Sequence, residues 1–314
     1  CKPFFIHLSV KRYILANISY NRAKMIIPNK LNIGDKVGLV STARHISIEE
    51  LNPAIRVLKE WGLELVFGSN IFSKSNQFAG TDIQRASDIQ SMIDDKSIKA
   101  IICTRGGYGT ARIIDLIDFT ALVKYPKWIV GYSDITVLHS HLNNLGLASL
   151  HSTMPINFDN NTSECLQSLH NCLFKTSNVI SAPKNSLNKT GSANAQIVGG
   201  NLSVIYSLLG SDSDIDTSNK ILFIEDLDEY LYHIDRMILS LKRNHKFSKI
   251  KGLIVGKMQD MHDNTNPFGK SADEIIYEHT KDDSFPICFD FPSGHIINNN
   301  SIILGKKSQL DINN

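Results

Sequence analysis

The chain has 314 residues, a formal net charge of +2 and a hydrophobic content of 42%. This composition is typical of a globular protein and excludes wholesale disorder. The small net charge gives no electrostatic basis for nucleic acid as a partner, and no apolar run approaches the ~20 residues of a membrane helix. The five cysteines are widely spaced and lack a CxxC pair. They indicate reduced, mostly buried thiols in a cytoplasmic protein, with neither a disulfide framework nor a zinc site.

The first 24 residues stand apart from the rest of the chain. The sequence starts at Cys1, whereas Met25 opens a segment that looks like a natural beginning. We expect residues 1–24 to be upstream translation or an expression artefact. The alternative is a lipoprotein whose mature end is Cys1, but the polar tether that usually follows such a cysteine is missing.

Strand and helix patterns alternate from about residue 35 to residue 151. The alternation predicts βαβ units and a mostly parallel sheet, in which chemistry lies in loops at the carboxyl ends of the strands. Predicted strands cover residues 35–40, 64–67, 99–104 and 128–131. Predicted helices cover residues 48–61, 82–93, 109–117 and 134–145.

A polar stretch, residues 157–196, separates this region from a second one. It is rich in Asn and Ser, and we interpret it as a helix-bearing connection that leads into a linker. The predicted elements beyond it are strands 220–224, 250–257 and 287–289, helices 230–242 and 272–279, and a terminal hairpin opened by 302–305. The prediction is an α/β fold with an N-terminal domain over 25–156 and a smaller, β-rich α/β C-terminal domain over 197–314.

The segment after predicted strand 128–131 is typical of a nucleophile elbow. The strand runs into Gly131-Tyr132-Ser133, and a helix follows at once, so that the Asp134 N–H would lie at the helix start. The segment departs from the G-x-S-x-G pattern because Ile135 stands at the last glycine position. Taken alone, it favours Ser133 or Asp134 as an ordinary helix N-cap.

A glycine-rich loop, Thr104–Gly109, follows the neighbouring predicted strand. Glycines let backbone N–H groups converge on an oxyanion, although an ordinary tight turn is an equal alternative. The loop is neither G-x-G-x-x-G nor a phosphate loop with GK[ST]. Since both loops follow neighbouring strands of one sheet, we expect them to face the same crevice.

Two later segments carry further candidates. Glu225 opens an acidic run after a predicted strand, and such a run supplies helix caps, metal ligands, a carboxylate that orients a histidine, or a solvated loop. His295 follows Gly294 in a late loop and could act as a general base, but it is one of 11 histidines. His139 and His141 lie at positions i and i+2 of a predicted helix, which do not share a face, so we expect no metal pair there.

Together these motifs resemble the LD-carboxypeptidase family of serine peptidases, which includes the microcin-immunity peptidases. In chain order they are IGDKVGLVSTA, RGGYG, GYSDIT, GGNLSVI, LFIEDLDE, YHIDRM and SGH. The resemblance covers about residue 26 to the C-terminus. It implies a triad of Ser133, Glu225 and His295, without a metal or a cofactor. It also implies a first domain like class I glutamine amidotransferases, an active site between the domains, and homodimers.

The family resemblance also implies the rest of the site. The oxyanion hole would be formed by backbone N–H groups of Gly106 or Gly107 and of Asp134. The substrate would be a murein tetrapeptide, cut between the L-centre of a diamino acid and the terminal D-alanine during peptidoglycan recycling. Arg105 or Arg112 could bind the free carboxylate. Further candidate contacts are Tyr108 for the substrate and Asp118, Asp134 and Asp228 for its amine.

Two alternatives to this function remain open. One is a peptidase that cleaves a toxic aminoacyl-nucleotide peptide, and the other is an inactive protein that binds murein peptides in the same cleft. The first would need aromatic insertions to stack the base. The region after Glu225 is short and offers only Tyr230 and Tyr232, which favours the murein peptide. Because the serine and its partners come from different halves, we also expect catalysis to depend on domain closure.

Overall fold

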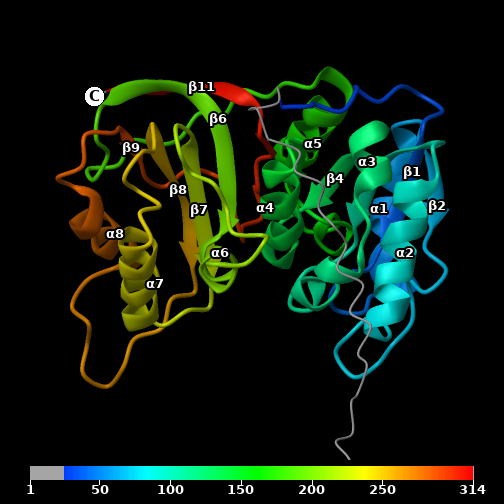
Figure 1. Ribbon diagram of the computed structural model, residues 1–314, viewed down its shortest axis with the longest axis horizontal. Helices are drawn as coiled ribbons and strands as arrows, with labels where there is room; N and C mark the ends of the chain where they lie inside the picture. The colour runs from blue at the N-terminus through cyan, green and yellow to red at the C-terminus, as the bar shows by residue number, and fades with distance from the viewer. Residues whose placement is uncertain (1–24, 314) are drawn as a thin grey trace, which may run out of the picture.

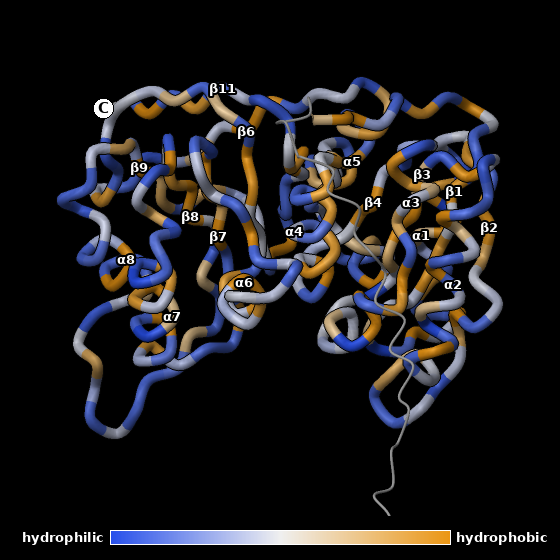
Figure 2. Tube along the Cα trace, in the orientation of Figure 1, coloured by the Kyte–Doolittle hydropathy of each residue, from blue (hydrophilic) through white to orange (hydrophobic). Residues whose placement is uncertain are grey.

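The computed structural model describes residues 25–313, which form two lobes, each built on its own β-sheet (Figure 1). The N-terminal extension, residues 1–24, lies outside the described residues. Figure 2 shows that hydrophobic segments concentrate on the strands and on the sides of the helices that face them, while the outer loops are hydrophilic. The architecture is therefore α/β, with two sheet-containing domains.

The first sheet has six strands in the order β10-β5-β4-β3-β1-β2. All neighbouring pairs are parallel except β10 with β5. The strands are β1 (Lys36–Val40), β2 (Glu64–Phe67), β3 (Ile98–Cys103), β4 (Trp128–Gly131), β5 (Ser149–His151) and β10 (Ile302–Leu304). Because β1, β3 and β4 are neighbours, the loops at their carboxyl ends meet at one edge of the sheet.

Helices cover both faces of the first sheet. One face packs against α1 (Ile48–Glu60) and α5 (Ser163–Lys175). The other packs against α2 (Asp82–Asp94), α3 (Thr120–Lys124) and α4 (Thr136–Asn144). Capping boxes start α1 and α2. The Ser47 and Thr81 hydroxyls accept from the backbone N–H of the third helical residue, and the side chain of that residue accepts from the backbone N–H of the cap.

The second sheet has five strands in the order β11-β6-β7-β8-β9, parallel except for β11 with β6. They are β6 (Gly191–Asn201), β7 (Ile221–Leu227), β8 (Gly252–Gln259), β9 (Ile287–Cys288) and β11 (Lys307–Ile312). One face packs on α6 (Leu202–Ser207), α7 (Leu231–Arg243) and α8 (Ala272–Thr280). Chain segments around Ile180 and Ile302 cover the other face.

Most predicted strands and helices are confirmed to within two residues of their ends, β1 to β4, α1, α2, α7 and α8 among them, whereas β7 runs three residues beyond its predicted end. Strand β5 and the short helices α3 and α6 were not predicted. The four cysteines within residues 25–313 are buried and unpaired, as predicted. No helix in this range is long and apolar enough to cross a membrane.

The predicted helix over residues 109–117 is wrong. The structure has two short 3-10 turns instead, Thr110–Arg112 and Ile114–Leu116. Gly109 lies at φ +146°, its carbonyl accepts from the Arg85 guanidinium at 2.8 Å, and the Thr110 N–H donates to the Asp134 carboxylate at 2.8 Å. These tertiary bonds, together with β-branched residues of low helix propensity, hold the segment in separate turns.

The predicted terminal hairpin is also wrong, because its two strands join different sheets. Strand β10 pairs with β5 of the first sheet, and β11 pairs with β6 of the second. All residues of β10 are buried, as suits a strand covered on both faces, whereas β11 alternates between buried and exposed residues. The last part of the chain therefore connects the two lobes.

The predicted connection over residues 157–196 is more ordered than a linker. It contains all of α5 and the first six residues of β6. Ala193 and Ala195 point into the core while Asn194 is exposed, so this half of β6 has the alternation of a strand. Its Gly, Ser, Ala and Asn residues have low β-propensity, and pairing with β11 holds the strand instead.

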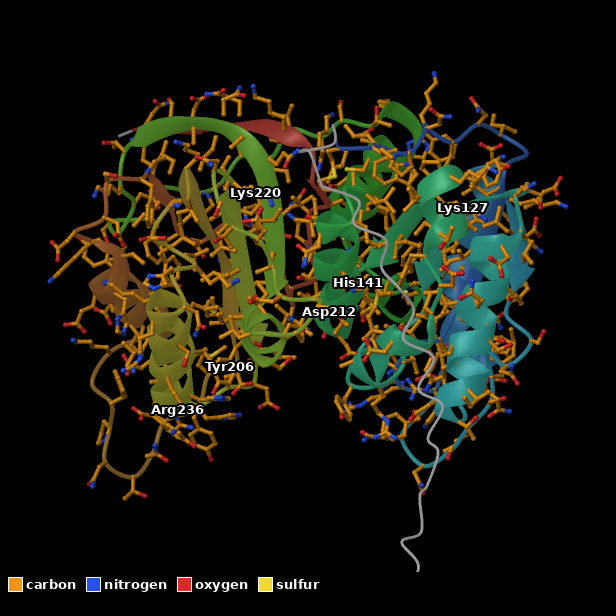
Figure 3. All side chains as sticks on the ribbon, viewed as in Figure 1. Lys127, His141, Tyr206, Asp212, Lys220 and Arg236 are labelled. Atoms are coloured by element: carbon orange, nitrogen blue, oxygen red, sulfur yellow. The ribbon has the colours of Figure 1, made fainter. Side chains whose placement is uncertain are left out.

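The two lobes make direct contacts between α4 and the chain around β6. The Asn201 N–H donates to the Thr136 hydroxyl at 3.0 Å, and His141 Nδ1 lies 3.0 Å from the Ser213 hydroxyl. Figure 3 shows His141 on α4 close to Asp212 on the facing lobe. The lobes therefore meet along a seam that runs past the start of α4, next to Ser133, and that also holds apolar contacts, since Val204 and Leu208 pack against the core of the first lobe.

Candidate active site

Ser133 occupies a strained turn between β4 and α4. Its φ of +61° lies in the left-handed region, which non-glycine residues rarely adopt and which often marks functional turns. Gly131 makes the turn possible, because a Cβ there would lie 2.7 Å from Cγ1 of Ile135. Ile135 thus packs over Gly131, which accounts for the departure from the G-x-S-x-G pattern. The turn has the features of a nucleophile elbow rather than of a helix N-cap.

The glycine-rich loop after β3 lies directly against Ser133. A Cβ on Gly106 would be 3.1 Å from the Ser133 Cβ and 3.3 Å from its Oγ. Among residues 25–313, no acceptor is bonded to the backbone N–H groups of Gly106, Gly107 or Asp134. Gly106 and Asp134 are buried, and a buried N–H without a partner is rare. The structure thus brings together the three groups predicted for an oxyanion hole.

Glu225 and His295 form a buried ion pair. Nδ1 of His295 lies 2.7 Å from Oε2 of Glu225, whose side chain is completely buried on β7. Burial acts to raise the pKa of Glu225, but His295 and His151 outweigh it and lower that pKa to about 2. Burial likewise acts to lower the pKa of His295, and the Glu225 carboxylate raises it above the ordinary value.

The His295 ring lies beside the elbow. Its centroid is 4.7 Å from that of Tyr132, the residue before Ser133. Within residues 25–313 the Ser133 hydroxyl makes no hydrogen bond to His295, and catalytic hydrogen bonds are often long before substrate binds. The three predicted triad residues therefore converge at the seam between the lobes. Ser133 follows β4 of the first sheet, Glu225 lies on β7 of the second, and His295 lies in the loop that leads from β9 to β10.

The loop that carries His295 is held by a side chain that sequence reasoning missed. Oδ1 of Asn299 accepts from the Gly294 N–H at 3.0 Å and from the Ser293 hydroxyl at 3.1 Å. Its backbone carbonyl accepts from the Cys165 thiol on α5 at 3.1 Å. Asn299 is the middle residue of a run of three asparagines, Asn298–Asn300. Asparagine side chains often hydrogen-bond to the backbone of irregular loops, so this run was a signal that could have pointed to Asn299.

Both predicted arginines lie beside acidic side chains. Arg105 lies 3.4 Å from Glu50, and Arg112 makes a two-pronged ion pair with Asp82. Arg44 was not predicted, yet its side chain is exposed and makes no hydrogen bond or ion pair with residues 25–313. Its Cδ and Nε lie 2.6 and 2.7 Å from where a Cβ on Gly107 would be. Its place at the end of β1 was the signal that could have found it.

The remaining predicted contacts are divided. Tyr108 is half exposed beside the glycine-rich loop, with its ring 6.0 Å from that of Phe78. Asp134 cannot face a substrate amine, because its carboxylate is buried and accepts from the Thr110 N–H. Asp118 caps the N–H of Thr120 in the short segment before α3. Asp228 pairs with His262 on the surface.

Comparison with known proteins gives the family. The family models described as LD-carboxypeptidase N-terminal and C-terminal domains match residues 37–152 and 194–310. The chain belongs to the LD-carboxypeptidase family. It is 32% identical to a Bacillus subtilis protein named "Probable murein peptide carboxypeptidase", covering 90% of this chain and 91% of that one. It is 24% identical to the microcin C7 self-immunity protein MccF of Escherichia coli, covering 90% and 92%.

A solved structure of the family has the same fold. The muramoyltetrapeptide carboxypeptidase from Oxalobacter formigenes superposes with a TM-score of 0.80 at 26% identity, covering 88% of this chain and 95% of that one. Family membership implies a serine carboxypeptidase, a hydrolase. Among the described residues, no three His, Cys, Asp or Glu side chains gather closely enough to hold a metal ion. The likeness to class I glutamine amidotransferases stays a prediction.

Proposed function

We propose that this chain hydrolyses the amide between the L-centre of a diamino acid and the terminal D-alanine of a murein tetrapeptide. The observation that carries the proposal is the buried Glu225–His295 pair beside a left-handed Ser133. The names of the Bacillus and Oxalobacter relatives support a murein peptide as substrate.

In the proposed mechanism, the Ser133 hydroxyl attacks the carbonyl carbon of the scissile amide. The His295 ring donates Nδ1–H to Glu225, which leaves Nε2 free to accept the serine proton. His295 then protonates the leaving nitrogen, the C–N bond breaks, and D-alanine departs. A water molecule, activated by the same nitrogen, hydrolyses the acyl-enzyme and regenerates Ser133.

The negative charge on the tetrahedral intermediate is stabilised by N–H groups that have no other acceptor among residues 25–313. These are the backbone groups of Gly106, Gly107 and Asp134. They are fixed before substrate binds, and two of the three are buried, which strengthens their interaction with an oxyanion. Each N–H group therefore stabilises the transition state, in which the oxygen gains negative charge, more than it stabilises the bound, uncharged amide.

Arg44 is the cation that we assign to the free carboxylate of the terminal D-alanine. Its side chain lies over Gly107, and no described residue competes for it. A guanidinium binds a carboxylate in a two-pronged geometry that a lysine cannot reproduce. We expect Arg44→Lys and Arg44→Ala to raise KM for the free acid at least tenfold, since a hydrogen bond to a charged group is worth about 1.5–3 kcal/mol.

Assays with a peptide that ends in D-alaninamide test this role of Arg44. The amide lacks the carboxylate, so both Arg44 variants should process it as the parent does. An equal loss on the free acid and on the amide would contradict the assignment. Arg56, also a surface arginine but on α1, offers a matched control as Arg56→Ala.

The finer biology belongs to the same proposal. We propose a cytoplasmic enzyme of peptidoglycan recycling that acts as a homodimer. Light scattering on the purified chain would test the assembly, with an expected mass of twice the 35.0 kDa of one chain. A monomer that retains full activity would contradict the homodimer.

A covalent probe separates the proposed enzyme from an inactive binding protein. A fluorophosphonate should label the parent chain at Ser133 and leave Ser133→Ala unlabelled. A folded parent that is not labelled would favour the binding protein. The aminoacyl-nucleotide alternative has one observation in its favour, the exposed Tyr230 and Tyr232 rings after β7, 5.6 Å apart. Faster turnover of an aminoacyl sulfamoyl nucleoside than of the tetrapeptide would support it.

A further inference from the structure

Glu225 has a second histidine beside it, which comes from the opposite lobe. His151 is the last residue of β5 in the first sheet, and its Nε2 lies 3.8 Å from Oε1 of Glu225. Both side chains are completely buried. The two oxygens of the carboxylate therefore face two different imidazoles, with His295 on Oε2 and His151 on Oε1.

The polar atoms on this second side have no partner at hydrogen-bond distance. Neither ring nitrogen of His151 has one among residues 25–313, and neither does Oε1 of Glu225. Buried polar groups in native proteins are nearly always hydrogen-bonded, so a donor and an acceptor left this close to each other require an explanation. A shift of less than 1 Å would bring Nε2 and Oε1 to an ordinary hydrogen-bond length.

The surroundings of His151 hold its ring in place while leaving this direction open. Its ring meets Phe223 edge-on at 5.0 Å and Tyr132 at 5.9 Å. In the sheet, His151 is the register partner of Gly131, which lies two residues before Ser133. Strand β4, which leads into Ser133, thus lies beside β5, which ends in His151. From there the His151 side chain reaches the Glu225 carboxylate of the other lobe.

We infer that His151 is a positioning residue of the triad: it donates Nε2–H to Oε1 of Glu225 during the reaction and so keeps Oε2 directed at His295. The inference rests on the proposed function. His151 touches neither substrate nor the reacting atoms, and acts only through Glu225. Because Glu225 and His151 belong to different lobes, the same bond ties the acid to the sheet that carries the serine.

The bond has a predictable effect on the pH dependence. A donor on Oε1 takes up part of the negative charge of Glu225 and so weakens its attraction for a protonated His295. Loss of the donor should raise the pKa of His295, and the acid limb of kcat/KM should move to higher pH. The titratable groups that face His151 are Glu225, His139 and Tyr132. His139 is engaged elsewhere, because its Nε2 bonds the Gly131 carbonyl at 2.8 Å.

Nitrogen-15 NMR of the histidine-labelled parent chain tests the bond without any substitution at His151. The inference requires a proton on Nε2 of His151, because only a protonated Nε2 can donate to Oε1 of Glu225. Assignment of the His151 signal follows from its absence in His151→Gln. A ring protonated only on Nδ1 would overturn the inference, because its unprotonated Nε2 could not donate to Glu225.

Kinetics of three variants test the consequence. His151→Phe keeps a ring but removes the donor, and we expect kcat to fall about 10- to 100-fold with KM within twofold, since one charge-assisted bond is lost. His151→Gln restores an N–H donor and should recover much of kcat. The control is His170→Phe on α5, whose ring stacks on Phe174 at 4.4 Å and should leave kcat and the pH profile unchanged.

The outcomes separate this inference from the proposed function. An active parent, an inactive Ser133→Ala and a His151→Phe with unchanged kcat and acid limb would overturn the inference alone. A fall in kcat without a shift of the acid limb, and without recovery in His151→Gln, would reduce His151 to a packing residue and also overturn it. An active Ser133→Ala would instead refute the proposed function.

Discussion

The Glu225–His295 pair makes Glu225→Gln the most informative single substitution. Glutamine has nearly the same shape as glutamate, so packing on β7 is preserved while the charge is removed. The 2.7 Å contact places the two charge centres roughly 4 Å apart, and at an effective dielectric constant of ~20 their attraction is about 4 kcal/mol. If this attraction stabilises the imidazolium in the transition state, its loss should lower kcat by about 10³-fold.

The same substitution should change the pH profile in a defined direction. In the parent, Glu225 raises the pKa of His295 above its ordinary value, against the effect of burial. His295 must be neutral to act as a base, so kcat/KM rises with pH through this raised pKa. In Glu225→Gln only the smaller attraction of Asp226 still opposes burial, so the pKa of His295 falls. The acid limb should therefore move to lower pH, even as kcat falls.

The assay is D-alanine release measured between pH 4 and pH 9, with thermal unfolding as the test of folding. Glu229→Gln is a matched control, because Glu229 also pairs with a histidine, His233, but in a partly exposed position after β7. It should leave both kcat and the acid limb unchanged. A Glu225→Gln variant with kcat within threefold of the parent and an unmoved acid limb would refute the role given to Glu225.

Two further substitutions test the parts that surround the triad. Gly106→Ala would place a Cβ 3.1 Å from that of Ser133. Displacement of the N–H groups should lower kcat about tenfold or more without lowering the unfolding temperature. An unchanged kcat would argue against this loop as the oxyanion hole. Asn299→Ala removes the acceptor of the Gly294 N–H, which should lower the free energy of unfolding by about 1–3 kcal/mol and kcat at least tenfold. Chemical denaturation and D-alanine release would measure both, with the exposed Asn194→Ala as control; loss of stability with full kcat would limit Asn299 to a structural role.

Local sequence patterns predicted the regular elements where periodicity and caps agree. Helices α1 and α2 show this best, since apolar spacing and a capping box coincide in both, and Gly62 follows the end of α1. The prediction fails where tertiary contacts override local preference. The segment 109–117 is held in turns by Arg85 and Asp134, and the first half of β6 is a strand because β11 pairs with it.

The candidate site needed more than local pattern. The segment around Ser133, taken alone, predicts an ordinary helix cap. Only the resemblance to a family placed Ser133 in one site with Glu225 and His295. The contact between Glu225 and His295 spans 70 residues, and no local periodicity encodes such a distance. Arg44 and His151 were missed for the same reason, since their importance depends on what the fold places beside Gly107 and Glu225.

The most direct test of the central claim is D-alanine release from a purified murein tetrapeptide by the full chain, beside its Ser133→Ala variant. We expect the parent to release one D-alanine per tetrapeptide, and the folded variant to release it no faster than a blank. Release by both chains at similar rates would contradict Ser133 as the nucleophile, and release by neither folded chain would contradict the murein tetrapeptide as substrate.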